Sequence, residues 1–117
     1  MSIGRSELAG LIGKIISALP EEREEGAENV CDWSQSFDLL EARIVVRILS
    51  VVAHSEKNAT VREAQLNAVA EIFSPRSMSR DDVAPVLEIP LPNLDPSEIS
   101  YIQGIGDSLG GIEGSPS

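Results

Sequence analysis

The chain has 117 residues and a formal net charge of −10, from 19 acidic and 9 basic side chains. Its apolar residues make up 42% of the chain and are almost all aliphatic, so we expect one domain with an aliphatic core. The negative charge would repel a phosphate backbone, so we expect no nucleic-acid partner. The single cysteine cannot form an internal disulfide and no signal peptide is evident, which together predict a cytoplasmic protein.

Apolar residues recur at helical spacing from Leu8 to Leu19, which predicts a first helix with Ser6 as its N-cap and Pro20 as its stop. A helix lying on a membrane surface would carry several Lys or Arg on its polar side, but this segment offers only Lys14. We therefore expect this helix to face the core and expect no membrane partner.

The next segment, PEEREEGAENVCDW (residues 20–33), holds six carboxylates and one arginine. Pro20 suits the first position of a helix, and at 3.6 residues per turn one face of that helix would carry four acids opposite Ala27 and Val30. The helix dipole favours an acid in the first turn but not at the far end. Like charges three or four residues apart cost roughly 0.2–0.5 kcal/mol per pair. The four acids are Glu21, Glu25, Glu28 and Asp32.

Three explanations of this acidic face remain open. It is a solvated surface, a docking surface for a basic partner, or the internal partner of a polar stripe on the following helix. A metal site is not expected, because carboxylates spaced along a helix do not converge on one ion. For the docking explanation, the candidate partner-binding residues are Glu21, Glu25, Glu28, Asp32 and Trp33.

Residues 36–54 form the most apolar stretch and predict the central helix, in which charged residues exclude a transmembrane span. Its polar stripe has helical spacing and could lie beside the acidic face. The stripe consists of Arg43, Arg47, Ser50 and His54.

The rest of the chain is also predicted to be helical. A capping box of Thr60 and Glu63 predicts a helix over 61–73. The proline-rich segment 74–94 allows one short helix, capped by Ser79 and broken near Pro85, and a last helix begins at Pro96. No segment alternates as a strand does. The expected architecture is all-α, with about five helices in one domain over 1–110 and a flexible tail over 111–117.

Catalytic chemistry has little support in the sequence. His54 is the only histidine, no pair of His or Cys residues has metal-ligand spacing, and Cys31 is expected to be a small core residue. The glycines of GIGDSLG (104–110) lack the strand and the Lys-Ser/Thr pair that phosphate loops need. We therefore predict no catalytic residues, no metal and no cofactor.

Two resemblances bear on function. The helices over 37–54 and 60–73 resemble one HEAT-type unit, whose second helix carries Val61, Arg62, Ala64, Ala68, Val69 and Ile72 in the characteristic positions, and no second copy of the pattern is evident. The acidic start, this helix pair, the proline-rich connector and the closing DPSE-x-x-Y helix are together similar to small immunity proteins encoded beside bacterial polymorphic toxins.

That resemblance implies a non-enzymatic protein that neutralises a cognate toxin by stoichiometric binding, with a basic toxin domain as its partner. The alternative is a small adaptor or structural subunit whose apolar first helix completes a larger assembly. The oligomeric state stays open.

Overall fold

The computed structural model describes residues 1–112 and contains α-helices and one 3₁₀ turn over that range, with no strand, which confirms the all-α class. Residues 113–117 of the predicted tail lie outside the described residues, and residues 111 and 112 belong to the last helix. The elements are α1 (Arg5–Ile15), α2 (Pro20–Asp32), α3 (Leu39–Ser55), α4 (Ala59–Ile72), α5 (Arg80–Leu87), the turn η1 (Leu91–Asn93) and α6 (Pro96–Ile112).

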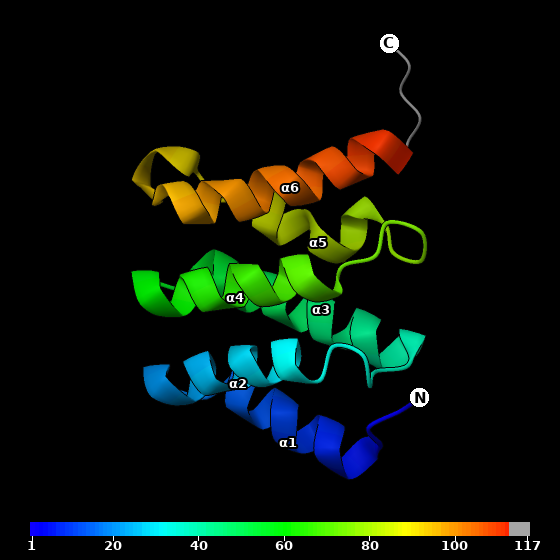
Figure 1. The fold of residues 1–117 in the computed structure, drawn as a ribbon. Coiled ribbons are helices and arrows are strands. Elements are labelled where there is room, and N and C mark those ends of the chain that lie inside the picture. Colours follow the sequence, from blue (N-terminus) through cyan, green and yellow to red (C-terminus); the bar gives the residue numbers. More distant parts are fainter. Residues whose placement is uncertain (113–117) are drawn as a thin grey trace.

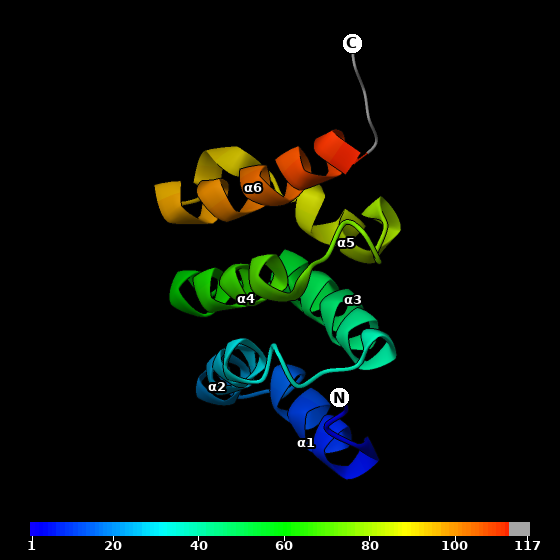
Figure 2. The ribbon, with the colours of Figure 1, turned by 45° about the vertical axis from the view of Figure 1, so that its right-hand side comes forward.

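The described helices form three antiparallel pairs, α1–α2, α3–α4 and α5–α6, stacked one on another (Figure 1). One layer of the stack contains α1, α3 and α5, and the other contains α2, α4 and α6 (Figure 2). The molecule measures 45 × 34 × 19 Å. Its smallest dimension is that of two helices, each about 10 Å across. The predicted HEAT-type pair corresponds to α3 and α4, and the structure adds a pair on each side of it.

The core lies between the two layers and is aliphatic, as the composition predicts. Fully buried side chains come from both layers, and Phe73 is the aromatic residue among the buried hydrophobics. The central pair contributes most of them, because it is covered on both sides by its neighbours. The apolar residues with no exposed surface there are Val45, Val46, Leu49, Ala53, Leu66, Ala68 and Val69.

Several local signals in the sequence proved correct. Pro20 occupies the first turn of α2, and Ala27 and Val30 of that helix are completely buried. Ser79 and Asp82 form the capping box at the start of α5. At the start of α6, the Asp95 amide donates to the Glu98 carboxylate over 3.0 Å.

Four predicted helix ends were wrong, and at the starts of α1 and α4 another residue takes the capping position. Gly4, at φ 88°, precedes α1 in place of a Ser6 cap. Asn58 caps α4 in place of Thr60, accepting from the Val61 amide over 3.1 Å. The helix α5 continues through Pro85 to Leu87, because the completely buried Val86 holds its last turn in the core. The first helix also ends at Ile15, before the predicted stop.

Buried ion pairs join each helix pair to the next. The guanidinium of Arg23 in α2 donates two hydrogen bonds, of 2.7 and 2.8 Å, to the carboxylate of Glu56 in the α3–α4 turn. The guanidinium of Arg62 in α4 donates two, of 2.5 and 3.3 Å, to Glu98 in α6. On the other layer, Arg47 of α3 donates to Asp82 of α5 over 2.6 Å. The three carboxylate side chains are at most 2% exposed.

The two bidentate pairs reveal an internal repeat. Arg23 and Arg62 are each the fourth residue of their helix, and each also donates to the backbone carbonyl six residues earlier, at Ser17 and Glu56 respectively. Each arginine therefore joins the turn of its own pair to a carboxylate near the start of the second helix of the next pair, Glu56 before α4 and Glu98 in the first turn of α6. The helix α2 shares this arginine contact with α4 but not the aliphatic spacing of the HEAT-like pattern.

The glycine within the acidic run, Gly26, lies where α1 and α2 approach each other closely. A Cβ at this position would lie 3.0 Å from the Ile15 amide nitrogen and 3.1 Å from the Lys14 Cβ of α1. The helices α1 and α2 cross at this point, and the missing side chain allows their backbones to approach. A cost of roughly 1 kcal/mol for glycine inside a helix is therefore offset by packing.

Gly26→Ala is expected to lower the free energy of unfolding by about 1–3 kcal/mol, because the added methyl group meets backbone atoms of α1. Gly104→Ala in α6 is the matched control, since its Cβ would meet nothing within 4 Å, and it should raise stability by up to about 1 kcal/mol. Urea unfolding of the two variants measures both values. Equal effects at the two positions would contradict the close approach.

Arg62→Met is expected to cost about 3–5 kcal/mol of unfolding free energy, because it leaves the buried Glu98 carboxylate without its counter-charge. Adding Glu98→Gln removes that charge, keeps an acceptor for the Asp95 amide, and should recover much of the loss. A double-mutant cycle by urea unfolding separates these terms. A double variant no more stable than Arg62→Met would show that charge burial does not dominate.

Candidate functional site

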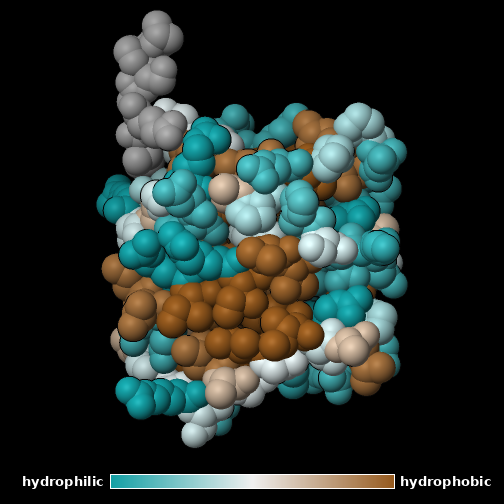
Figure 3. Space-filling view, turned by 180° about the vertical axis from the view of Figure 1, so that it is seen from behind, coloured by the Kyte–Doolittle hydropathy of each residue, from teal (hydrophilic) through white to brown (hydrophobic). Residues whose placement is uncertain are grey.

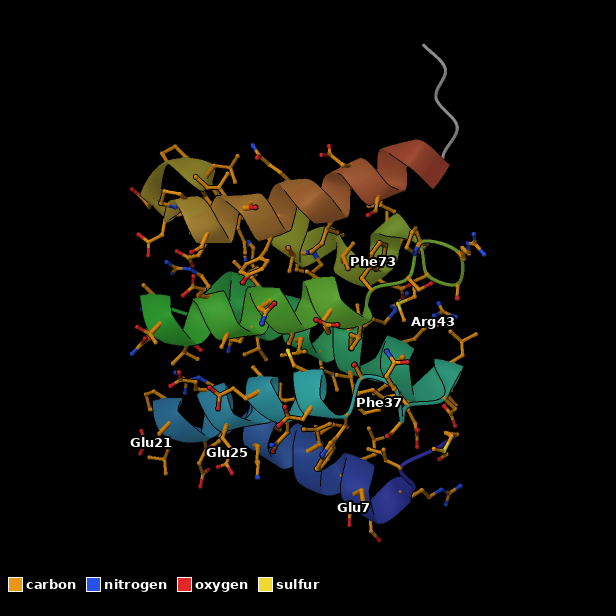
Figure 4. All side chains as sticks on the ribbon, viewed as in Figure 1. Glu7, Glu21, Glu25, Phe37, Arg43 and Phe73 are labelled. Carbon is orange, nitrogen blue, oxygen red and sulfur yellow. The ribbon has the colours of Figure 1, made fainter. Side chains whose placement is uncertain are left out.

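The acidic residues of α2 lie on its outer face. Glu21, Glu25, Glu28 and Asp32 are all exposed, as their spacing predicts, and Figure 4 shows Glu21 and Glu25 projecting from α2 away from α4. Lys14 of α1 donates to Glu25 over 3.1 Å. Within the described residues, Glu28 and Asp32 form no ion pair. Glu25 is therefore the partly neutralised member of the group.

A second helix extends this acidic surface. Glu28 and Asp32 of α2 and Glu71 of α4 surround the half-buried Cys31, whose pKa is raised first by burial and then by the nearby negative charges, Glu71 foremost. The Cys31 thiol is thus protonated at neutral pH and has a contact of 3.7 Å from the Asn67 amide. We call the surface made by Glu21, Glu25, Glu28, Asp32 and Glu71 the acidic face.

The basic residues are concentrated elsewhere. In the described parts of α2, α4 and α6, the cationic side chains are Arg23 and Arg62, and both are bound to buried carboxylates. Exposed bases lie in the other layer and in turns, and include Arg5, Arg47, His54 and Lys57. The molecule therefore separates its charges between its two broad faces.

The structure excludes one of the three explanations of the acidic face, that of internal pairing with the stripe on α3. The stripe on α3 does not lie beside α2: Arg43 and Arg47 approach Asp82 of α5, over 3.5 and 2.6 Å, and Ser50 is completely buried. The physical reason is the stacking, which places α5 rather than α2 against that side of α3. His54 is exposed in the last turn of its helix.

Trp33 does not belong to the acidic face. Its half-buried ring packs against the core and lines a small pocket with Met1, Ile3 and Glu7, next to α1. It follows Asp32 in sequence, but the backbone leaves helical geometry at Trp33. The predicted pairing of Trp33 with the four acids in one binding surface is therefore not realised.

The opposite face carries a large apolar surface (Figure 3). The helices α1 and α3 run side by side there but contact each other less closely than α3 and α5 do. Leu40 and Val51 of α3 are 68% and 57% exposed, and Ile16 at the end of α1 is 59% exposed. We call the surface between these two helices the α1–α3 groove, lined by Leu8, Ile16, Leu40, Ile44, Val51 and Val52.

The groove is hollowed at both ends. A pocket of about 340 Å³ lies between the first turns of α1 and α3 and includes Arg5 on its rim. A second pocket, of about 550 Å³, lies beside the last turns of the same helices and includes Lys57. Neither Arg5 nor Lys57 forms an ion pair within the described residues.

The sequence analysis missed this groove, although α3 contained a signal for it. Two apolar stripes run along α3, one through Val45, Val46 and Leu49 and one through Leu40, Ile44 and Val51. Two apolar stripes on one helix are normally both buried, but a molecule two helices thick covers only one of them. In the first helix, Leu11 and Ile15 are buried in the core, and the exposed apolar residue is Ile16 at its end.

The N-terminal segment is held at one end of the groove by Glu41 of α3. This carboxylate accepts hydrogen bonds from the Asp38, Ile3 and Gly4 amides and from the Ser2 hydroxyl, at 2.8 to 3.1 Å. These donors, the Asp38 amide first, lower the pKa of Glu41 to about 2. The buried Glu56 carboxylate also has a lowered pKa, mainly because of its hydrogen bonds from Arg23.

Comparisons with protein-family models, with curated proteins and with solved structures gave no match for this chain. None of the described helices combines the length and apolar character required to cross a bilayer. Among the described residues, no three or more His, Cys, Asp or Glu side chains are grouped so that they could hold a metal ion. The most distinctive surfaces of the described residues are the acidic face and the α1–α3 groove.

Glu41 is expected to make attachment of the N-terminal segment depend on pH. Because folding lowers its pKa from 4.5 to about 2, its contribution is complete above pH 4.5 and is lost as the pH falls towards 2. Glu41→Gln should therefore release the segment even at pH 7. Hydrogen exchange of the Ile3 and Gly4 amides measures this release, with core amides of α3 reporting global unfolding. Unchanged exchange in Glu41→Gln, with Glu88→Gln as control, would contradict it.

Proposed function

We propose that this protein is a non-enzymatic cytoplasmic binding protein that neutralises a cognate toxin by stoichiometric association, with the acidic face as its recognition surface. The observation that carries the proposal is the separation of charge. Carboxylates of α2 and α4 lie together on one broad face, and the arginines of those helices are bound to buried carboxylates. Such a surface attracts a basic partner and raises its rate of association.

The acidic residues of α2 lower the stability of their own helix, and this observation supports the same proposal. Glu28 and Asp32 lie towards the C-terminal end of α2, where the helix dipole disfavours them, and Asp32 is in the last turn. Neither has a counter-charge among the described residues, and each repels the other and Glu71. Residues that folding does not require, and that mildly oppose it, are reasonable contacts for a partner.

The resemblance to immunity proteins of bacterial toxin systems implies that the partner is a toxin domain. A toxin domain that acts on nucleic acid or on another anionic substrate has a basic active-site surface, and an acidic protein covers such a surface by charge complementarity. The acidic face of this chain extends over two neighbouring helices, α2 and α4, which lie side by side (Figure 1).

An adaptor function is the second candidate, and the exposed α1–α3 groove favours it. Large contiguous apolar patches on a small protein mark interaction sites. The two candidates use opposite faces and different forces, so they can be tested separately.

The double charge reversal Glu28→Lys/Asp32→Lys is expected to slow association with the product of the neighbouring reading frame by about tenfold or more at low salt. The difference should shrink as salt rises, because salt screens exposed charges. Stopped-flow or surface-plasmon measurements at two salt concentrations give the rates, and co-expression gives protection from toxicity.

The matched control is Asp81→Lys/Glu88→Lys on α5, which changes the net charge equally at exposed positions away from the acidic face. It should have a much smaller effect. If both double variants associate as the wild type does, the acidic face has no part in recognition.

A further inference from the structure

We propose that a small pocket beside Trp33 binds one organic cation, a guanidinium or alkylammonium group. This pocket, which we call the Trp33 pocket, lies between the start of α1 and the end of α2 and shares no residue with the acidic face. Its lining residues are Met1, Ser2, Ile3, Glu7, Trp33 and Ser36. The inference does not rest on the proposed function, because it is tested with small cations and needs no toxin.

The size of the pocket suits a small ligand. Its volume is about 310 Å³, at the lower end of the range of about 300–1,000 Å³ for ligand pockets, so it accommodates one side chain or one small molecule. A second hollow, of about 230 Å³, also includes Trp33 and Glu7 in its lining. These two side chains therefore border both hollows.

Trp33 forms a rigid aromatic wall. Its amide donates to the Asn29 carbonyl over 2.9 Å, and its carbonyl accepts from the Ser36 amide over 2.8 Å. One part of the half-buried ring packs against the core, and another part lines the pocket. A cation placed over the face of an aromatic ring is attracted by its π electrons, and Trp attracts it most strongly. The ring is thus held in place before any ligand arrives.

The pocket also presents acceptors that have no partner. Glu7 lies in the first turn of α1 (Figure 4). Within residues 1–112, neither its carboxylate nor the Ser36 hydroxyl forms a hydrogen bond or an ion pair. The Ser2 hydroxyl, by contrast, donates to the buried Glu41 over 2.8 Å, which fixes the N-terminal wall of the pocket. A carboxylate and a hydroxyl both accept hydrogen bonds from the N–H groups of guanidinium and ammonium ions.

The charges around the pocket favour a cation. Of the side chains that line it, only Glu7 is charged, and the exposed Asp32 directly precedes Trp33. Lys14, which lines the second hollow, is already in an ion pair. The amino group of Met1 forms no ion pair with Glu7 within the described residues. The two carboxylates therefore outweigh this amino group, and the local charge is negative.

The same groups disfavour other ligands. An anion would be repelled by Glu7 and by the nearby Asp32. An apolar ligand would remove water from the Glu7 carboxylate and the Ser36 hydroxyl without replacing the lost hydrogen bonds, which is costly. A cation with an apolar stem satisfies the carboxylate, the hydroxyl and the ring together.

The test uses the only tryptophan of the chain as its reporter. Ethylguanidinium or butylammonium chloride, added at constant ionic strength, should shift the indole N–H resonance of Trp33 and change its fluorescence saturably. Ethylurea, the uncharged counterpart of ethylguanidinium, should have little effect. Glu7→Gln should weaken binding by about threefold, because it removes the ion pair with the ligand. Glu7 is exposed, so the fold should tolerate this change.

The matched control is Asp81→Asn, which removes an exposed acid from the first turn of α5 and should leave binding unchanged. Two larger probes distinguish the sources of the cation. Tighter binding of the capped peptide acetyl-Gly-Arg-Gly-amide would assign the pocket to an arginine side chain of a protein. Tighter binding of agmatine would assign it to a free amine. Either result supports the cation site.

Three results would overturn the proposal. They are the absence of a saturable response of Trp33 to either cation, an equal response to ethylurea, and an affinity in Glu7→Gln equal to that in Asp81→Asn. The amide resonances of the core of α3 report in each variant that the fold is retained.

Discussion

The structure depends on arginine side chains that reach from one helix pair to a buried carboxylate of the next. A stack only two helices thick has a thin core, so neighbouring pairs need specific contacts to fix their positions. Arg23 and Arg62 supply them in a planar, bidentate geometry that tolerates little rotation. Their partners are fully desolvated, so misplacing one pair would leave an unpaired charge in the interior. The ion pairs thus specify how the pairs are stacked.

The same thinness produces the two contrasting faces. Each helix in a two-layer stack turns one side inward, its two edges towards its neighbours, and one side outward. In α2 the outward side is acidic, and in α3 it is apolar. The cations of α2 and α4 are bound in the buried ion pairs, so the exposed cations lie in the other layer and in turns. The internal contacts that hold the stack therefore also decide the charge of its surfaces.

Local signals in the sequence predicted much of the helical structure, and contacts distant in sequence limited the rest. Pro20, the Ser79–Asp82 box and the start of α6 act within one turn, so they could be recognised from neighbouring residues. The partners of Arg43 and Arg47 depend on which helix lies next to α3, which no local pattern contains. The shared contact of Arg23 and Arg62 could not be predicted, because α2 has the arginine but not the aliphatic spacing of the HEAT-like pattern.

The buried ion pairs also give the stack a direction. Arg23 has a successor in Arg62, but the fourth residue of α6 is Ile99, which offers no guanidinium to anything placed beyond it. The two arginine–carboxylate contacts therefore run from the α1–α2 pair to the α5–α6 pair, and α6 does not continue the series. A helix pair appended after α6 would find no guanidinium at the position that Arg23 and Arg62 occupy in their helices. The arginine contact that joins successive helix pairs is therefore not available for adding a further pair after α6.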